Sequence, residues 1–406
     1  MRPILVVFLL CLAETLSMSA FSTYPALLAV IQQTWGLSNS AAGFVSGMYF
    51  GGYMVAVPVL ASLTDRLDAR RVYLFSASLS AIGALGFAFA GWGFRSALVW
   101  QAIGGMGLAG TYMPGLKILT DHVEGRIQSR AIAFYTSTFG IGTSLSFWMA
   151  GAIAGATAWR WAFAVAAIGP VLAGLIVIAA LPPARVTLAG VRAAGVADIR
   201  RLWRALTNPN AFRFVAAYGA HCWELFGVRS WITAFFAFAA TARPGAAVWA
   251  PATAAAAINL LGPLASILGN EVAGRMGRVR HITTVMASSI ALACVVGFAA
   301  PLPWMLLFGA AAIYFLTVMA DSAALTAGVV ASSDPAERGA TMAVYSLAGF
   351  GAGFLAPLAF GFVLDAAGGQ GRGLAWGLAF AGLAAPTAIV LPLLVNRRES
   401  RDHRAG

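Results

Sequence analysis

Two short basic segments decide how this sequence folds, because they show that one arrangement occurs twice along the chain. The first reads Asp65-Arg66-Leu67-Asp68-Ala69-Arg70-Arg71, and the second, 209 positions later (65 to 274), reads Gly274-Arg275-Met276-Gly277-Arg278-Val279-Arg280. Three other pairs have nearly the same offset: Arg130 with Arg338, Gly140-Ile141-Gly142 with Gly349-Phe350-Gly351, and Glu14 with Glu224. Duplicated halves are a common design of membrane transporters, so we expect two pseudo-symmetric halves.

The composition around these segments is that of a membrane protein. Of the 406 residues, 60% are hydrophobic and 10% are charged, whereas soluble domains have about 45–50% apolar and about 25% charged residues. The apolar runs last roughly 18 to 25 positions, which suits membrane-spanning helices and not the alternating strands of a β-barrel. Since one span needs about 20 residues, the sequence predicts an all-α membrane protein with twelve transmembrane helices in two six-helix bundles.

The polar breaks between the apolar runs place the predicted helices and domains. We expect helices at 4–28, 41–63, 72–92, 96–119, 132–155, 161–181, 212–238, 247–268, 282–300, 304–330, 340–364 and 373–395. The predicted organisation is an N-terminal bundle at 1–181, a basic linker at 182–211, a C-terminal bundle at 212–395 and a basic tail at 396–406.

The basic residues orient the predicted helices. The chain has 26 Lys and Arg against 14 Asp and Glu, a formal charge of +12. Twenty of the 26 fall on the side that holds both chain ends and four on the other side, which places both termini in the cytoplasm of an inner-membrane protein. The positive charge therefore reflects topology and attraction to the lipid bilayer, and it does not indicate a nucleic-acid partner.

The sequence shows no convincing motif for a disulfide, a metal site, nucleotide binding or catalysis. Cys11, Cys222 and Cys294 lie in apolar runs without paired spacing, so neither a disulfide nor a metal site is expected. The run Gly105-Met106-Gly107-Leu108-Ala109-Gly110 matches a dinucleotide fingerprint, but it lies inside a predicted span without a preceding strand. No ATP-binding loop and no nucleophile–base pair stands out, so we expect no cofactor and no enzyme, and energy from a gradient.

The first basic segment also carries a family resemblance. The chain around it, 61–71, reads Ala-Ser-Leu-Thr-Asp-Arg-Leu-Asp-Ala-Arg-Arg and resembles the loop signature G-x-L-x-D-R-x-G-R-R/K of the major facilitator superfamily, with Ala61 and Asp68 in place of its two glycines. The resemblance covers nearly the whole chain, which is also loosely similar to the bacterial cyanate or nitrate permease-like branch. It implies twelve helices, alternating access and a cavity between the halves.

The resemblance further implies a gate at this loop. In the family, the acid at the position of Asp65 meets cationic groups and a neighbouring helix end in one of two conformations. We therefore expect gating roles for residues of both copies of the loop: Asp65, Arg66, Arg70, Arg71, Arg275 and Arg278. The alternative is that the arginines only keep the loop on the cytoplasmic side.

Ionisable residues inside the predicted spans are the first candidates for function, because they are costly at membrane depth. They are Glu14, Lys117, His221, Glu224, Arg229 and Asp321, and they lie on spans 1, 4, 7 and 10. The resemblance places these four helices around the central cavity. We therefore expect the charges to line a polar, water-accessible cavity between the halves.

The acids are the candidates for proton coupling, because a carboxylate in a poorly hydrated place suits reversible proton binding. Glu224 is the first candidate, since His221 lies three residues away and would share or relay the proton. Glu14 and Asp321 are further candidates.

The basic and aromatic residues are candidates for binding the substrate. Arg229 can hold an anion in a bidentate grip, or it can pair with Glu224 or Glu14 to lower the cost of burial. Lys117 either lines the cavity mouth or extends to the membrane interface. Tyr24, Tyr112 and Trp223 can stack on an organic substrate, or they can be ordinary packing residues.

The leading hypothesis is a monomeric secondary active transporter, proton-coupled, that moves a small solute, with an anion favoured because of Arg229. The alternative substrate is a cationic or amphipathic compound exported against protons, which the three acids favour. A membrane sensor or assembly factor that does not transport is the alternative of another class.

Overall fold

The computed structural model describes residues 3–64, 66–181, 199–242, 245, 247–334 and 337–395. Within these ranges all regular secondary structure is helical. Eleven segments are long and apolar enough to cross a membrane. The twelfth long helix is α5 (Phe94–His122), which packs against α3 and α4. The predicted all-α architecture with twelve transmembrane helices is confirmed.

The helices of the first half occupy the chain up to residue 180. They are α1 (Pro3–Ser17), the short 3-10 helix η1 (Met18–Ala20), α2 (Thr23–Trp35), α3 (Asn39–Leu63), α4 (Ala69–Ala90), α5, η2 (Gly125–Ile127), α6 (Gln128–Ala156), α7 (Trp159–Ala166) and α8 (Ile168–Ala180). The first span thus consists of α1, η1 and α2.

The second half begins after a nine-residue helix, α9 (Ile199–Thr207). Its helices are α10 (Pro209–Ala242), α11 (Pro251–Leu260), α12 (Gly262–Met276), α13 (Arg278–Val296), α14 (Trp304–Ala320), α15 (Ser322–Ser332), α16 (Arg338–Ala366) and α17 (Gly373–Val395). The span of α14 and α15 is interrupted at Asp321.

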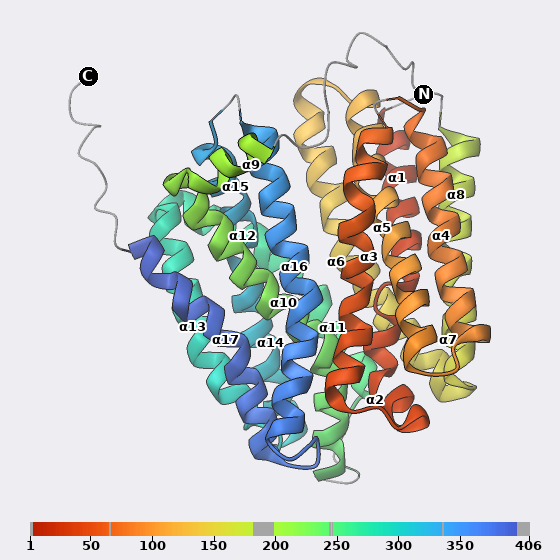
Figure 1. The fold of residues 1–406 in the computed structure, drawn as a ribbon, viewed down its shortest axis with the longest axis vertical. Helices are drawn as coiled ribbons and strands as arrows, with labels where there is room; N and C mark the ends of the chain where they lie inside the picture. The colour runs from red at the N-terminus through yellow and green to blue at the C-terminus, as the bar shows by residue number, and fades with distance from the viewer. Residues whose placement is uncertain are drawn as a thin grey trace.

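Figure 1 shows the two groups of helices side by side, with α1–α8 in red to yellow and α10–α17 in green to blue. We call the side of the molecule on which α1 begins and α17 ends the chain-end side, and the opposite side the far side. The halves meet mainly through α3 against α16 and through α6 against α11.

Two glycines allow α3 and α16 to touch. A Cβ atom at Gly43 would overlap the carbonyl oxygen of Pro357, and one at Gly47 would overlap that of Phe354. Small residues of this kind let helix backbones approach closely in membranes. This contact brings the two halves together along one line.

The helix ends follow the expected positions within about four residues, with two larger differences. The first span, predicted at 4–28, continues in α2 to Trp35. The predicted eighth span at 247–268 is the pair α11 and α12, which begins at Pro251 and continues to Met276. Two spans of the first half contain a proline: α5 continues as one helix through Pro114, and span 1 is interrupted by η1 ahead of Pro25. Proline is tolerated in the first turn of a helix, where Pro25 lies in α2.

Candidate functional site

Glu14 is fully buried inside the first half. Its Oε2 atom lies 3.1 Å from the hydroxyl of Tyr135 on α6 and 3.3 Å from that of Ser17 on α1. Its Oε1 atom has no hydrogen-bond partner among the described residues. Both hydroxyls also lie within 3.0 Å of a backbone carbonyl, that of Tyr112 for Tyr135 and that of Glu14 itself for Ser17. Each hydroxyl has a single proton, so the carboxyl group shares its donors with other acceptors.

Glu224 on α10 has the corresponding environment in the second half. Its Oε2 atom accepts from Ser289 of α13 at 3.1 Å and from Thr387 of α17 at 3.4 Å. Its Oε1 atom has no partner in the described part of the chain, and Ser289 again shares its proton with a carbonyl, that of Met286. The two repeat partners therefore each face the interior of their own half, whereas the sequence predicted that they face a common cavity.

His221 contacts Asp321 and not the carboxyl oxygens of Glu224. The Nδ1 atom of His221 lies 2.8 Å from Oδ1 of Asp321, close enough for an ion pair, although the angles are not those of a hydrogen bond. Both side chains are buried. Asp321 lies at the break between α14 and α15, where the Nε2 atom of His281 lies 3.0 Å from the carbonyl oxygen of Ala320. Two histidines therefore hold this break.

Arg229 is the charged group of the predicted set that lines a cavity between the halves. It lines a small, largely enclosed cavity of about 20 Å³, room for about one water molecule. The other walls of this cavity come from both halves: Phe21, Ser22, Pro25, Ser46, Tyr49, Phe50 and Gln101 from the first, and Phe226 and Ser230 from the second. The hydroxyl of Ser46 donates to that of Ser230 at 2.8 Å and so joins the halves beside the cavity.

The guanidinium group of Arg229 is held without an acid. Its Nε donates to Oδ1 of Asn259 at 2.9 Å, and its centre lies 5.7–5.9 Å from the rings of Phe139, Phe226 and Phe315. No carboxylate of a described residue lies within ion-pair distance of it. The structure therefore shows no pairing with Glu14 or Glu224, the alternative that the sequence left open.

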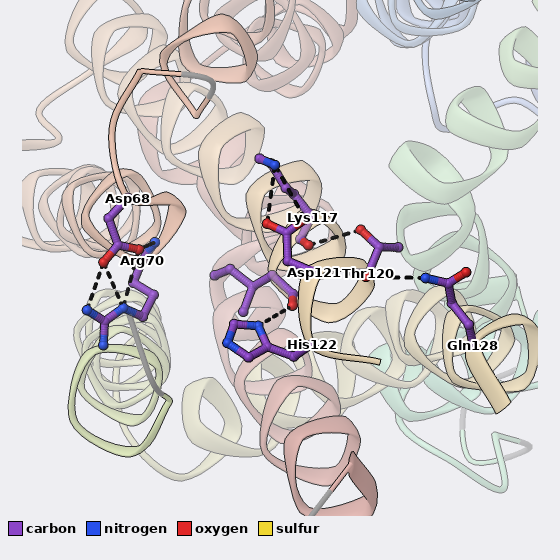
Figure 2. A network of polar contacts seen from close by, with 8 residues as sticks. Asp68, Arg70, Lys117, Thr120, Asp121, His122 and Gln128 are labelled. Atoms are coloured by element: carbon purple, nitrogen blue, oxygen red, sulfur yellow. Dashed lines mark hydrogen bonds and ion pairs between the residues drawn. The ribbon is translucent and has the colours of Figure 1, made fainter. Parts of the chain in front are cut away.

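The other predicted binding residues lie in different surroundings. Tyr24 is buried and donates to the carbonyl of Ala42, away from the cavity. Tyr112 is half-buried and stacks on Tyr135, and the half-buried Trp223 leaves its indole N–H without a described partner. Lys117 forms an ion pair of 3.2 Å with Asp121, one turn further along α5 on the chain-end side (Figure 2).

The predicted gate at the first basic loop is described in part. Asp65 lies outside the described residues. In the first copy of the loop, Arg66 and Arg71 are exposed. In the second copy, Arg275 is exposed and Arg278 is half-buried. Figure 2 shows the contact that the loop does make, between Asp68 and Arg70.

Asp68 caps α4 and holds Arg70. Its carboxylate accepts from the backbone N–H of Arg70 at 3.0 Å and forms an ion pair of 2.7 Å with its guanidinium, which also donates to the carbonyl of Leu181 at the end of α8. Partial burial works to raise the pKa of Asp68, but the hydrogen bonds from Arg70 and the charges of Arg70 and Arg71 outweigh it and lower the pKa. Arg70 thus joins the start of α4 to the end of α8 within the first half.

The far side holds a contact between the halves that the sequence did not indicate. The carboxylate of Asp365, at the end of α16, accepts four hydrogen bonds from the first turn of α3, two from backbone N–H groups of Asn39 and Ser40 and two from their side chains. Gln370 adds hydrogen bonds to Gln32 and Asn39. An acid at a helix N-terminus is favourable, so these contacts close the far side.

Sequence reasoning missed several residues of these sites, namely Tyr135, Asn259, Ser289, Gln101, Ser46, Ser230 and Asp365. All except Asp365 are uncharged, so the rule that finds costly charges in spans does not find them. Asp365 lies at the end of a predicted helix, where an acid is ordinary.

Comparison with known proteins agrees with this architecture. The sequence profile described as Major Facilitator Superfamily matches residues 10–269. No match was found among curated proteins. One similar solved structure is a bacterial homologue of the human lysosomal transporter Spinster in an inward-facing and occupied conformation, with 18% identity, a TM-score of 0.73, and coverage of 96% of this chain and 94% of that one.

A second similar structure is a mutant of the nucleoside transporter NupG. It has 15% identity and a TM-score of 0.76, with 96% of this chain and 99% of that chain covered. Sequence identities this low show a common fold and do not identify the substrate of this protein. The family match, which covers more than half of the chain, shows that this protein belongs to the major facilitator superfamily.

Proposed function

We propose that the protein is a proton-coupled secondary transporter that moves a small anion across the bacterial inner membrane by alternating access, with both chain ends in the cytoplasm. The observation that carries this proposal is Arg229, a buried cation that faces the space between the halves without a described carboxylate as partner. Burying an unpaired charge is costly. An anionic solute would supply the missing charge.

The cavity supports a small anion. A guanidinium group offers several donors in a plane. Nε of Arg229 donates to Asn259, and the two terminal nitrogens have no hydrogen-bond partner among the described residues, so they can grip a carboxylate or a similar group. Gln101, Ser22 and Ser230 add polar atoms, and Phe50 and Phe226 add an apolar wall. The cavity in this conformation has no room for a solute, so binding requires the halves to separate on one side.

That side is the cytoplasmic one. Asp365 and Gln370 close the far side, and the excess of basic residues on the chain-end side supports an orientation in which the far side lies outside the cell. The structure therefore supports a conformation that exchanges solute with the cytoplasm, and the opposite conformation requires the hydrogen bonds of Asp365 to break.

Glu14 and Glu224 are the proposed proton sites. An ionised carboxylate that is fully buried, without a cation and with shared donors, is costly, so proton binding suits these positions. Glu224 lies five residues before Arg229 on α10, and at about 100° per residue the two side chains point in different directions. One helix thus carries a proton site toward its own half and the anion site toward the other half.

The anion site is tested by thermal stability of the purified protein in detergent with a panel of small anions and organic cations. We expect one class of anion to stabilise the protein and Arg229→Gln to lower the affinity roughly 10- to 100-fold, the value of a hydrogen bond to a charged group. Arg95→Gln, an exposed arginine on the far side, is the matched control. Stabilisation by anions that persists unchanged in Arg229→Gln would remove Arg229 from the site.

Export of cationic compounds is the second candidate, and the buried acids Glu14, Glu224 and Asp321 favour it. In that case organic cations stabilise the protein in the same panel, and Arg229→Gln leaves their effect intact. Asp321 then becomes the first residue to replace, because it lies on the broken span opposite α10 and contacts only His221 among the described ionisable side chains.

A further inference from the structure

A groove on the outer surface of the second half lies apart from the transport path. It runs between α13 and α17 and is lined by Thr283, Thr284, Ala287, Ser288, Ala291, Leu391 and Val395. Its volume is about 580 Å³ and it is open along its length. The groove lies on the chain-end side, because α13 begins there at Arg278 and α17 ends there at Val395.

The shape of the groove suits a thin, extended occupant. Its lining runs from Thr283 to Ala291 on α13, which is eight residue steps or about 12 Å along the helix axis, and from Leu391 to Val395 on α17. An open, shallow groove that runs along two neighbouring spans suits a lipid acyl chain lying parallel to them.

The hydroxyl groups of the groove donate mainly to backbone carbonyls of their own helix. The hydroxyl of Thr283 donates to the carbonyl of Arg280, and that of Ser288 donates to the carbonyl of Thr284. Two of the three hydroxyls are thus satisfied by the helix, and that of Thr284 has no partner among the described residues. The other lining side chains offer an occupant only carbon atoms: Ala287, Ala291, Leu391 and Val395.

Positive charge lies at the mouth of the groove. Arg280 is exposed one turn before Thr283, and Arg278 is the first residue of α13. Neither α13 nor α17 contains an acidic residue. Basic residues at the cytoplasmic ends of transmembrane helices attract anionic lipid headgroups.

We propose that this groove is a binding site for an anionic phospholipid of the leaflet on the chain-end side. One acyl chain lies in the groove between α13 and α17, and the phosphate lies at Arg280. This site is independent of the proposed anion site, because none of its residues lines the cavity of Arg229.

The test is native mass spectrometry of the purified full chain, titrated with phosphatidylglycerol or phosphatidylcholine with the same acyl chains. We expect the wild type to retain phosphatidylglycerol about fivefold better, which is the contribution of one basic residue near the surface. Arg280→Gln should abolish this preference, and Ala287→Trp should lower the retention of both lipids because the indole fills the groove.

Matched controls come from positions outside the groove. Ser78→Trp changes the repeat counterpart of Ala287 on α4, and Arg95→Gln removes an exposed charge on the far side; both should retain lipid as the wild type does. Arg280 is exposed, so its replacement leaves the packing intact.

Three results would overturn the proposal: equal retention of the two lipids by the wild type, unchanged retention in both groove variants, or a dimer that Ala287→Trp dissociates, which would make the groove an interface between copies.

Discussion

Glu14 and Glu224 show that the two halves keep the same chemistry at the same depth. Each carboxyl group is buried in its own half, with one oxygen near two hydroxyls and the other without a described partner. The sequence predicted the two acids from their offset of 210 positions. It did not predict their partners, because Tyr135 lies 121 residues from Glu14 in the chain and its position depends on how α6 packs on α1.

The protonation of these acids is a prediction at the residue scale. Because an unpaired buried carboxylate is costly, we expect both to carry a proton in this conformation at neutral pH. Infrared spectroscopy in H₂O and D₂O should show the carbonyl band of protonated carboxylic acids, and Glu14→Gln and Glu224→Gln should each remove a component of it. Glu271→Gln, an exposed residue of α12, is the control. A band that neither variant changes would contradict the assignment.

Asp68 provides a pH-dependent prediction on the chain-end side. Since the pKa of Asp68 is lowered in the folded protein, its ion pair with Arg70 stabilises the protein above the unfolded pKa of about 3.9, and this contribution is lost as the pH falls through the folded pKa. Each side chain of the pair is 13% exposed, and for an ion pair at the surface of the chain-end side the effect is about 0.2–1 kcal/mol. Asp68→Asn should therefore lower the melting temperature in detergent at pH 7, with a smaller difference at acidic pH.

A difference that stays constant from pH 7 to the acid limit would show that the Asp68 charge does not matter. Asn caps a helix about as well as Asp, so this variant removes the charge and keeps the cap of α4. Asp121→Asn, which removes the exposed ion pair with Lys117 on α5, is the comparison.

At the scale of elements, α10 connects the proposed sites. It carries His221 and Glu224 toward the second half and Arg229 toward the cavity. A change in the packing of α10 against α13 and α17 when Glu224 gains or loses its proton would move Arg229. The sequence predicted that α10 carries these charges, but it did not predict which way each one faces, since three, five and eight residue steps leave several arrangements of neighbours possible.

The ends and breaks of helices were harder to predict than their existence. Long apolar runs define a span whether or not the helix is continuous, so the break at Asp321 and the 3-10 turn Met18–Ala20 left no signal in hydropathy. The breaks are held by contacts from distant elements, such as the one from His281 to Ala320.

The contact of α3 with α16 leads to a prediction about the closed far side. Asp365→Asn removes the charge that the N-terminus of α3 stabilises. Hydrogen bonds to a charged group are worth about 1.5–3 kcal/mol, so the ratio of closed to open molecules should fall about tenfold or more. Spin labels at Thr34→Cys and Ala366→Cys, in a variant without the three native cysteines, should then report a longer distance.

A matched pair of glycine variants tests whether the close approach of α3 and α16 keeps the far side closed. Gly47→Ala places a methyl group on the carbonyl of Phe354 and should open the far side in the same way, whereas Gly309→Ala, with open space around it, should not. If Asp365→Asn and Gly47→Ala both keep the short distance, the contact does not control the far side.

At the scale of the whole molecule, the halves are joined on the far side and around Arg229. Composition and the internal repeat were sufficient to predict the fold, because twelve apolar helices in two related halves leave few architectures. The arrangement of the acids was not predicted correctly in one respect: the expected common cavity contains Arg229, while Glu14, Glu224 and Asp321 are buried outside it. Hydropathy shows that a residue lies in a span. It does not show whether the residue faces a cavity or is packed inside one half.

Solute-driven proton movement in proteoliposomes, reported by a pH-sensitive dye inside the vesicles, tests proton-coupled anion transport most directly. We expect one class of small anion to change the internal pH, and we expect Glu224→Gln to abolish this change while the anion still stabilises the variant in detergent. Glu271→Gln should behave as the wild type does. Undiminished proton movement in both Glu14→Gln and Glu224→Gln, or movement driven only by organic cations, would contradict proton-coupled anion transport.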